Sequence, residues 1–237
     1  MKSSDIDEVG ITGGYLIEMD TYYDEVNKFK SEICDLPVML KEPEEDVLQE
    51  QQFEYIQNYI NTIEQALYSD DFAKTREYAS YISDTTFIDF WFVTELTNNR
   101  ETAYPKSSYF YKDRSKKLKA GPMWDFDWGT FTTTSGFCIK DALWYSQLFK
   151  DPAFVRKVKE RWDKLKPSFK EVALSLEETA IMLSISVELN DEMWSLQNAR
   201  NINGDERMSH RDAVLSYLKK NYENRIEWLD TQIQQLK

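Results

Sequence analysis

The spacing of apolar residues predicts that most of the chain is helical. Ile56, Ile60, Ile63 and Leu67 recur at intervals of three or four residues, and the Pro and acidic residues from Glu44 onward are typical of a helix start. The stretch 84–96 is apolar on most sides, which predicts a central helix covered by its neighbours. Further stretches with helical spacing predict helices over 141–150, 152–172, 176–197 and from near Ser209 to the end of the chain.

Strand signals are fewer and lie mainly near the start of the chain. Runs rich in aromatic and branched residues predict strands over 15–20, 37–41 and 108–112, and the basic run 114–119 is typical of a hairpin loop. Two strands make a marginal sheet, so the first two need further strands or helices to dock on. We therefore predict one domain of the α+β class, mostly α. It has a residual β portion over 1–43 and a helical body over 44–237, with a β-hairpin at about 107–125.

The composition of the chain excludes several classes of protein and of binding partner. Seven Trp, fourteen Tyr and thirteen Phe indicate a globular core, and a net charge of −13 disfavours nucleic acid and anionic membranes as partners. No run approaches the roughly 20 apolar residues of a spanning helix, so we expect no membrane span. Cys34 and Cys138 fit no metal-binding spacing and are expected as buried free thiols, the alternative being a single disulfide in an oxidising compartment. The single His210 excludes a multi-histidine metal site.

Two carboxylates stand close together in the run KAGPMWDFDWGTF, residues 119–131. Gly121-Pro122 is a strong signal for the end of a strand. In an extended segment, residues two apart point to the same side, so Asp125 and Asp127 could converge on one cation such as Mg²⁺. The alternative is that Asp125 caps a turn and the neighbouring tryptophans belong to the core.

Several stretches together resemble one known family. GGYLIEMD, PVMLKEP, ELTNNRETAYPKSSYFYKD and GPMWDFDWGTF resemble the CotH family of atypical protein kinases, and DPAFVRKVKERW and RIEWLD are similar to its helical C-terminal part. The resemblance covers nearly the whole chain. It implies a kinase-like fold in which ATP and a divalent cation, Mg²⁺ or a similar ion, lie between a β-rich N-lobe and a helical C-lobe. It also implies a protein substrate with a Ser or Thr acceptor.

The resemblance assigns roles to particular residues. Asp125 corresponds to the metal-binding Asp, and Asp127 to a second ligand or a neighbour of the first. Glu101 stands where the family has its catalytic Asp, and its extra methylene displaces the carboxylate, which matters for a general base. Lys106 and Ser107 occupy about the place of the catalytic-loop residues that hold phosphate or metal.

A second departure concerns the start of the chain. Only fourteen residues precede Tyr15, where the family has further N-lobe strands, so the resemblance implies a helical C-lobe with a few strands left from an incomplete N-lobe. We expect such a chain to be a weak or inactive kinase. The alternative is a non-catalytic, pseudokinase-like or surface interaction module that binds a protein or glycan. A hydrolase using Glu101 and Asp125 as its two acids is a third hypothesis.

Overall fold

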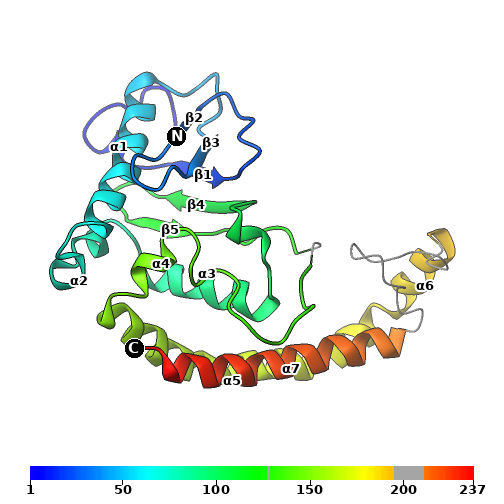
Figure 1. Cartoon of the computed structure of the whole chain (residues 1–237). Coiled ribbons are helices and arrows are strands. Elements are labelled where there is room, and N and C mark those ends of the chain that lie inside the picture. Colours follow the sequence, from blue (N-terminus) through cyan, green and yellow to red (C-terminus); the bar gives the residue numbers. More distant parts are fainter. Residues whose placement is uncertain (127–128, 195–210) are drawn as a thin grey trace.

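The computed structural model describes residues 1–126, 129–194 and 211–237, and it contains one antiparallel sheet and seven α-helices within those ranges (Figure 1). The strands are β1 (Tyr15–Met19), β2 (Lys28–Lys30), β3 (Pro37–Glu42), β4 (Ser108–Lys112) and β5 (Leu118–Ala120). The helices are α1 (Glu50–Leu67), α2 (Phe72–Thr75), α3 (Asp84–Thr97), α4 (Tyr145–Leu148), α5 (Pro152–Met182), α6 (Ser184–Met193) and α7 (Arg211–Gln235). Short 3-10 helices span Gly10–Thr12, Glu77–Ser80 and Glu101–Ala103. The chain therefore combines α and β structure, as expected, with helices predominating.

The sheet unites the two β regions that the sequence pattern keeps apart. Its strand order is β2-β3-β1-β4-β5, and β1 pairs with both β3 and β4. The hairpin β4–β5 is thus part of the same sheet as the N-terminal strands and not a separate insert in the helical body. This pairing supplies the additional strands that β1 and β3 need. The sequence pattern misses β2, which has three residues, because its one buried apolar side chain, Phe29, makes too short a signal.

Several helix boundaries differ from the predicted ones. The helix predicted from Glu44 begins at Glu50, because the side chain and backbone of Gln49 form a reciprocal capping box with Gln52. The helix predicted over 141–150 shortens to the four residues of α4. The stretches predicted as two helices over 152–172 and 176–197 divide instead at Leu183, between the 31-residue α5 and α6.

The central helix is α3, as its apolar surface predicts. Phe87, Trp91 and Phe92 are each 1% exposed or less. The ring of Phe87 lies 5.6 Å from that of Phe110 on β4 and 6.1 Å from that of Trp144, so one aromatic cluster joins the sheet, α3 and the segment before α4. Because this cluster is buried, the first turn of α3 and the hairpin are held in fixed positions relative to each other.

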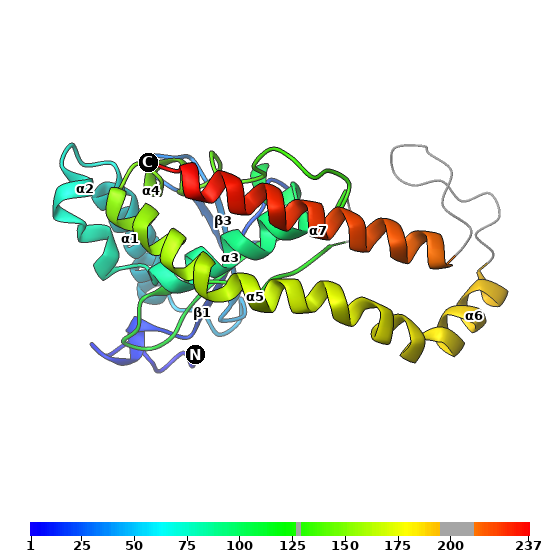
Figure 2. The same cartoon turned by 90° about the horizontal axis from the view of Figure 1, so that it is seen from below.

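Helices α5 and α7 run antiparallel below this core and continue beyond it, so that α6 lies at the far end of a projecting arm (Figures 1 and 2). Near the core the pair is tied by Asp230, which accepts from Trp162 Nε1 at 2.7 Å and forms an ion pair with Lys166 at 3.0 Å. Among the helices of the described ranges, none combines the length and apolar character needed to cross a bilayer.

Candidate active site

The two acidic positions singled out in the sequence follow two neighbouring elements of the core. Glu101 begins the 3-10 helix just after α3, and Asp125 follows β5. The hairpin ends where the Gly121 amide donates to the Tyr109 carbonyl oxygen at 2.8 Å, so Gly121-Pro122 terminates the strand as predicted. Both loops leave the core from elements that the aromatic cluster fixes.

One buried amide side chain joins these loops. Asn99 is 3% exposed, and its Nδ2 donates to the backbone carbonyl oxygen of Asp125 at 2.8 Å. Its Oδ1 accepts from the backbone amide of Glu101 at 3.1 Å. Since one partner is a backbone acceptor and the other a backbone donor, only this orientation of the amide satisfies both. Asn99 therefore sets the spacing between the Glu101 and Asp125 segments.

Asp125 has an unusual backbone conformation. Its φ of 62° places it in the left-handed region, which L-residues other than Gly, Asn and Asp seldom adopt. Trp124 beside it is 61% exposed, so the hypothesis that the tryptophans of this run are core residues is wrong for Trp124. Asp127 and Trp128 lie outside the described residues, as does His210.

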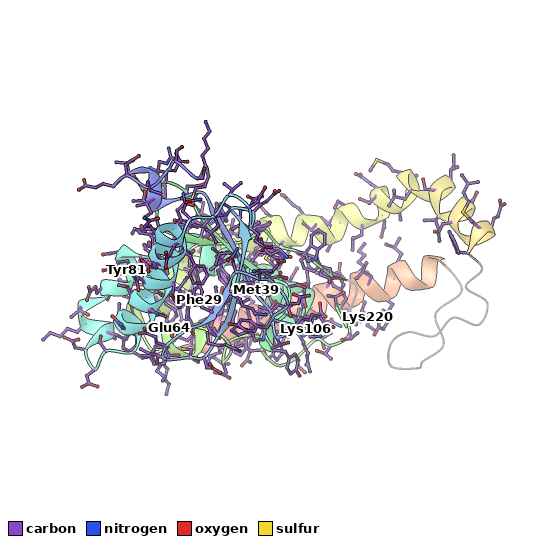
Figure 3. All side chains as sticks on the ribbon, turned by 90° about the horizontal axis from the view of Figure 1, so that it is seen from above. Phe29, Met39, Glu64, Tyr81, Lys106 and Lys220 are labelled. Carbon is purple, nitrogen blue, oxygen red and sulfur yellow. The ribbon has the colours of Figure 1, made fainter. Side chains whose placement is uncertain are left out.

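Lys106 and Ser107 lie against the end of β1. The Ser107 amide donates to Asp20 Oδ2 at 2.9 Å, and the Tyr22 amide donates to Asp20 Oδ1 at 2.7 Å. Lys106 Nζ donates to the Tyr22 hydroxyl at 3.2 Å and lies 4.3 Å from the centre of that ring. The hydrogen bond to Tyr22 raises the pKa of Lys106, which keeps it cationic. Seen from above, Lys106 lies further toward the arm than Met39 of β3 (Figure 3).

The loop after Asp125 is fastened by a buried ion pair between α3 and α7. Glu95 Oε2 lies 2.7 Å from Arg225 Nη2, and both side chains are at most 1% exposed. Glu95 also accepts from the amides of Cys138 at 2.8 Å and Ile139 at 3.0 Å, while Arg225 Nη1 donates to the Gly136 carbonyl oxygen at 2.7 Å. The carboxylate and the guanidinium are thus fully engaged in holding this loop.

The thiol of Cys138 belongs to the same cluster and is not a nucleophile. Burial raises the pKa of Cys138 to about 12, so the sulfur remains protonated at neutral pH. Its Sγ accepts from Asn98 Nδ2 at 3.0 Å. Both cysteines are free, as their spacing predicts.

An open groove between the sheet and α3 lies next to the segment that leads to Asp125. It has a volume of about 610 Å³. Its walls include Leu16 of β1, Tyr111 of β4, and Pro122 and Met123, which come just before Asp125. Its α3 wall includes Phe90 and Val93. The lining is largely apolar. Because it includes Met123, this apolar surface lies two residues before Asp125, the candidate metal ligand.

The carboxylates of the candidate site suit a cation that is bound partly by the protein and partly by phosphate oxygens. No three side chains of His, Cys, Asp or Glu gather as a preformed metal centre among residues 1–126, 129–194 and 211–237. Mg²⁺ in phosphoryl-transfer sites is commonly held by one or two carboxylates together with substrate phosphates and water. Asp125 can supply one such carboxylate, so the residues fit Mg²⁺ bound together with a nucleotide.

Two residues that organise the site were not among the predicted ones. Asn99 and Asp20 are both buried polar side chains whose hydrogen bonds orient the predicted residues. The sequence carries a weak signal for each: Asn99 lies two residues before Glu101, and Asp20 follows directly on a strand. Their partners are backbone groups, however, and the positions of backbone groups cannot be predicted from residue types alone.

A comparison with protein-family models gives one match. The model described as CotH kinase protein matches residues 4–234. No curated protein and no solved structure matches the chain.

Proposed function

The chain belongs to the CotH kinase family, and on that premise we propose that it binds ATP with Mg²⁺ and transfers the γ-phosphoryl group to a Ser or Thr hydroxyl of a protein. The observation that carries the proposal is Asn99, whose one side chain binds both the Glu101 amide and the Asp125 carbonyl oxygen. A positioned base and a positioned metal ligand are what phosphoryl transfer needs, because its catalysis is mainly orientation and charge neutralisation.

In this proposal Asp125 holds the cation. Bound Mg²⁺ would neutralise charge on the β- and γ-phosphates. The contribution of the protein is to fix the backbone of Asp125 through Asn99, so that only the side chain of Asp125 remains to be ordered when the nucleotide binds. The apolar groove that ends at Met123 offers a surface for the adenine ring.

Glu101 is proposed as the group that accepts the proton of the acceptor hydroxyl. Its backbone is held at both sides, since its amide donates to Asn99 and its carbonyl oxygen accepts from the Lys106 amide at 3.0 Å. The longer side chain places the carboxylate about one methylene further out than the Asp usual in this family. We therefore expect transfer to be slow.

Lys106 and Ser107 are proposed to contact the phosphates. Tyr22 orients the Lys106 ammonium. The Ser107 amide is already bound to Asp20, so the contribution of Ser107 would come from its hydroxyl. A cation and a hydroxyl on one loop are suitable partners for phosphate oxygens.

Calorimetric titration with Mg²⁺·ATP tests this function. Saturable binding is expected, and it should disappear in Asp125→Ala but persist in Asp113→Ala, which removes an exposed carboxylate from the β4–β5 turn. Phosphate incorporation into a Ser-containing protein, measured by mass spectrometry, tests the transfer step. Absence of nucleotide binding, or equal binding in both variants, would count against the proposal and favour an interaction module.

A further inference from the structure

The end of α5 and the whole of α6, in the distal part of the arm, carry an excess of negative charge. Residues 171–194 contain six acidic residues and no Lys or Arg. Glu177 forms an ion pair with Lys219 of α7 at 2.6 Å. Glu178, Glu188 and Glu192 are exposed, so negative charge accumulates along this end of the arm.

Large apolar side chains occupy the same end. Ile185, Leu189 and Met193 follow one another at intervals of four residues on α6 and are 71%, 58% and 73% exposed. Ile181 and Met182, in the last turn of α5, are 71% and 76% exposed. These five residues are here called the arm stripe. Exposed apolar side chains gathered in this way mark interaction surfaces, whereas single ones need no explanation.

The body of the protein does not cover the arm stripe. Helix α6 lies at the outer end of the arm, away from the sheet and from α3 (Figures 1 and 2). The 31-residue length of α5 carries these side chains beyond the core that its first half packs against. An apolar surface held out in this way is available to another molecule.

The charges around the arm stripe decide between possible occupants. Glu188 and Glu192 lie four residues apart on α6, and each follows the preceding stripe residue by three positions, so both flank the stripe. A second copy that docked through its own arm stripe would bring the same acidic residues against these and be repelled. An anionic membrane surface would be repelled for the same reason. A helix with apolar residues on one face and Lys or Arg beside them satisfies both features.

We propose that the arm stripe docks a basic amphipathic helix of another protein. Apolar side chains of that helix would cover Ile185 and Leu189, and its cationic side chains would pair with Glu188 and Glu192. This inference does not depend on nucleotide binding or phosphoryl transfer, because it rests only on residues 171–194.

Fluorescence anisotropy with a labelled helical peptide of Leu and Lys, about fourteen residues long and amphipathic, tests the proposal on the full chain. Saturable binding is expected. The double variants Ile185→Ser/Leu189→Ser and Glu188→Lys/Glu192→Lys should each weaken binding by about tenfold or more. Higher salt should also weaken binding to the unmodified chain, because the ion pairs are exposed.

Matched control variants separate this site from general attraction to an acidic protein. Val9→Ser/Val26→Ser removes two exposed apolar side chains elsewhere, and Glu45→Lys/Glu54→Lys makes the same charge change away from the arm. Both should bind the peptide as the unmodified chain does. Equal loss in the controls, no saturable binding, or equal binding of a peptide with Glu in place of Lys would overturn the proposal. So would sedimentation showing self-association that Ile185→Ser/Leu189→Ser abolishes, since a second copy would then be the occupant.

Discussion

The side chain of Asn99 binds the backbone of Asp125: Nδ2 of the first donates to the carbonyl oxygen of the second at 2.8 Å. This bond connects the end of the central helix α3 with the loop that leaves β5. Because the same side chain also accepts from the Glu101 amide, both halves of the candidate site depend on one buried group.

Two substitutions of Asn99 distinguish the effects of its two hydrogen bonds. Asn99→Asp keeps an oxygen for the Glu101 amide but sets a carboxylate against the Asp125 carbonyl oxygen, so we expect Mg²⁺·ATP affinity to fall about tenfold. Asn99→Ala removes both bonds and should also lower the free energy of unfolding by about 1–3 kcal/mol. Calorimetry and urea denaturation measure the two effects. Unchanged nucleotide affinity in both variants would show that Asn99 does not position Asp125.

Substitution at Glu101 tests the proposed base. Glu101→Gln keeps the length of the side chain and removes its basicity, so phosphate transfer should fall by about 10²-fold or more. Glu101→Asp restores the shorter side chain of the family and should raise the rate several-fold, because the backbone bond to Asn99 is unaffected. Binding of Mg²⁺·ATP should change little in either variant. If Glu101→Gln transfers phosphate as fast as the unmodified chain, another group is the base.

The buried pair of Glu95 and Arg225 should be sensitive to loss of one partner. Arg225→Met leaves the Glu95 carboxylate buried without its guanidinium, and we expect a loss of about 3–5 kcal/mol in the free energy of unfolding. Glu95→Gln combined with Arg225→Met should recover part of this loss, since no unpaired charge remains.

Arg156→Met is the matched control for that prediction. The Arg156 side chain is 66% exposed and lies 3.9 Å from Glu160, so its replacement should change stability by less than about 0.5 kcal/mol. Similar stability of Arg156→Met and Arg225→Met in thermal or chemical denaturation would contradict a structural role for the buried pair.

Lys112 should make stability depend on pH above neutrality. It is 2% exposed, lies 4.7 Å from the Tyr59 ring centre, and burial lowers the pKa of Lys112 from 10.5 to about 8. Between these two values the unfolded chain binds more protons than the folded one, so the free energy of unfolding rises with pH from about 8. Over pH 8–10 the rise is about 2 kcal/mol. Below pH 8 the lysine is charged in both states and contributes no slope.

Denaturation in urea at several pH values, with and without Lys112→Met, checks that prediction. The variant should lose the rise, whereas Lys116→Met in the exposed turn should keep it. The window closes near pH 10, because burial raises the pKa values of Tyr55 and Tyr59 and these phenols then act in the opposite direction. If the free energy of unfolding of the unmodified chain did not change with pH over this range, burial of Lys112 would not lower its pKa.

The sequence predicts the core elements well and the connections between them poorly. β1, β3, α3 and β4 lie where the apolar stretches of the sequence predict them, because each contains several apolar side chains that become buried. The pairing of β1 with β4 joins residues nearly a hundred positions apart in the sequence. It depends on packing around Phe110, which a local sequence pattern cannot predict. Likewise Asp125 can be picked out by its residue type and Glu101 by the family resemblance, whereas Asn99 is recognised only through the backbone atoms that it joins.

Arg225 is synthesised long after the two residues of the site that it binds. It lies 89 residues after Gly136 and 130 after Glu95, both of which it binds. At roughly 5–20 residues per second, a ribosome needs several seconds to synthesise that interval. During this time the loop after Asp125 exists without the guanidinium that fastens it. The candidate site is therefore completed late in synthesis, because the loop cannot be fastened before α7 has been made.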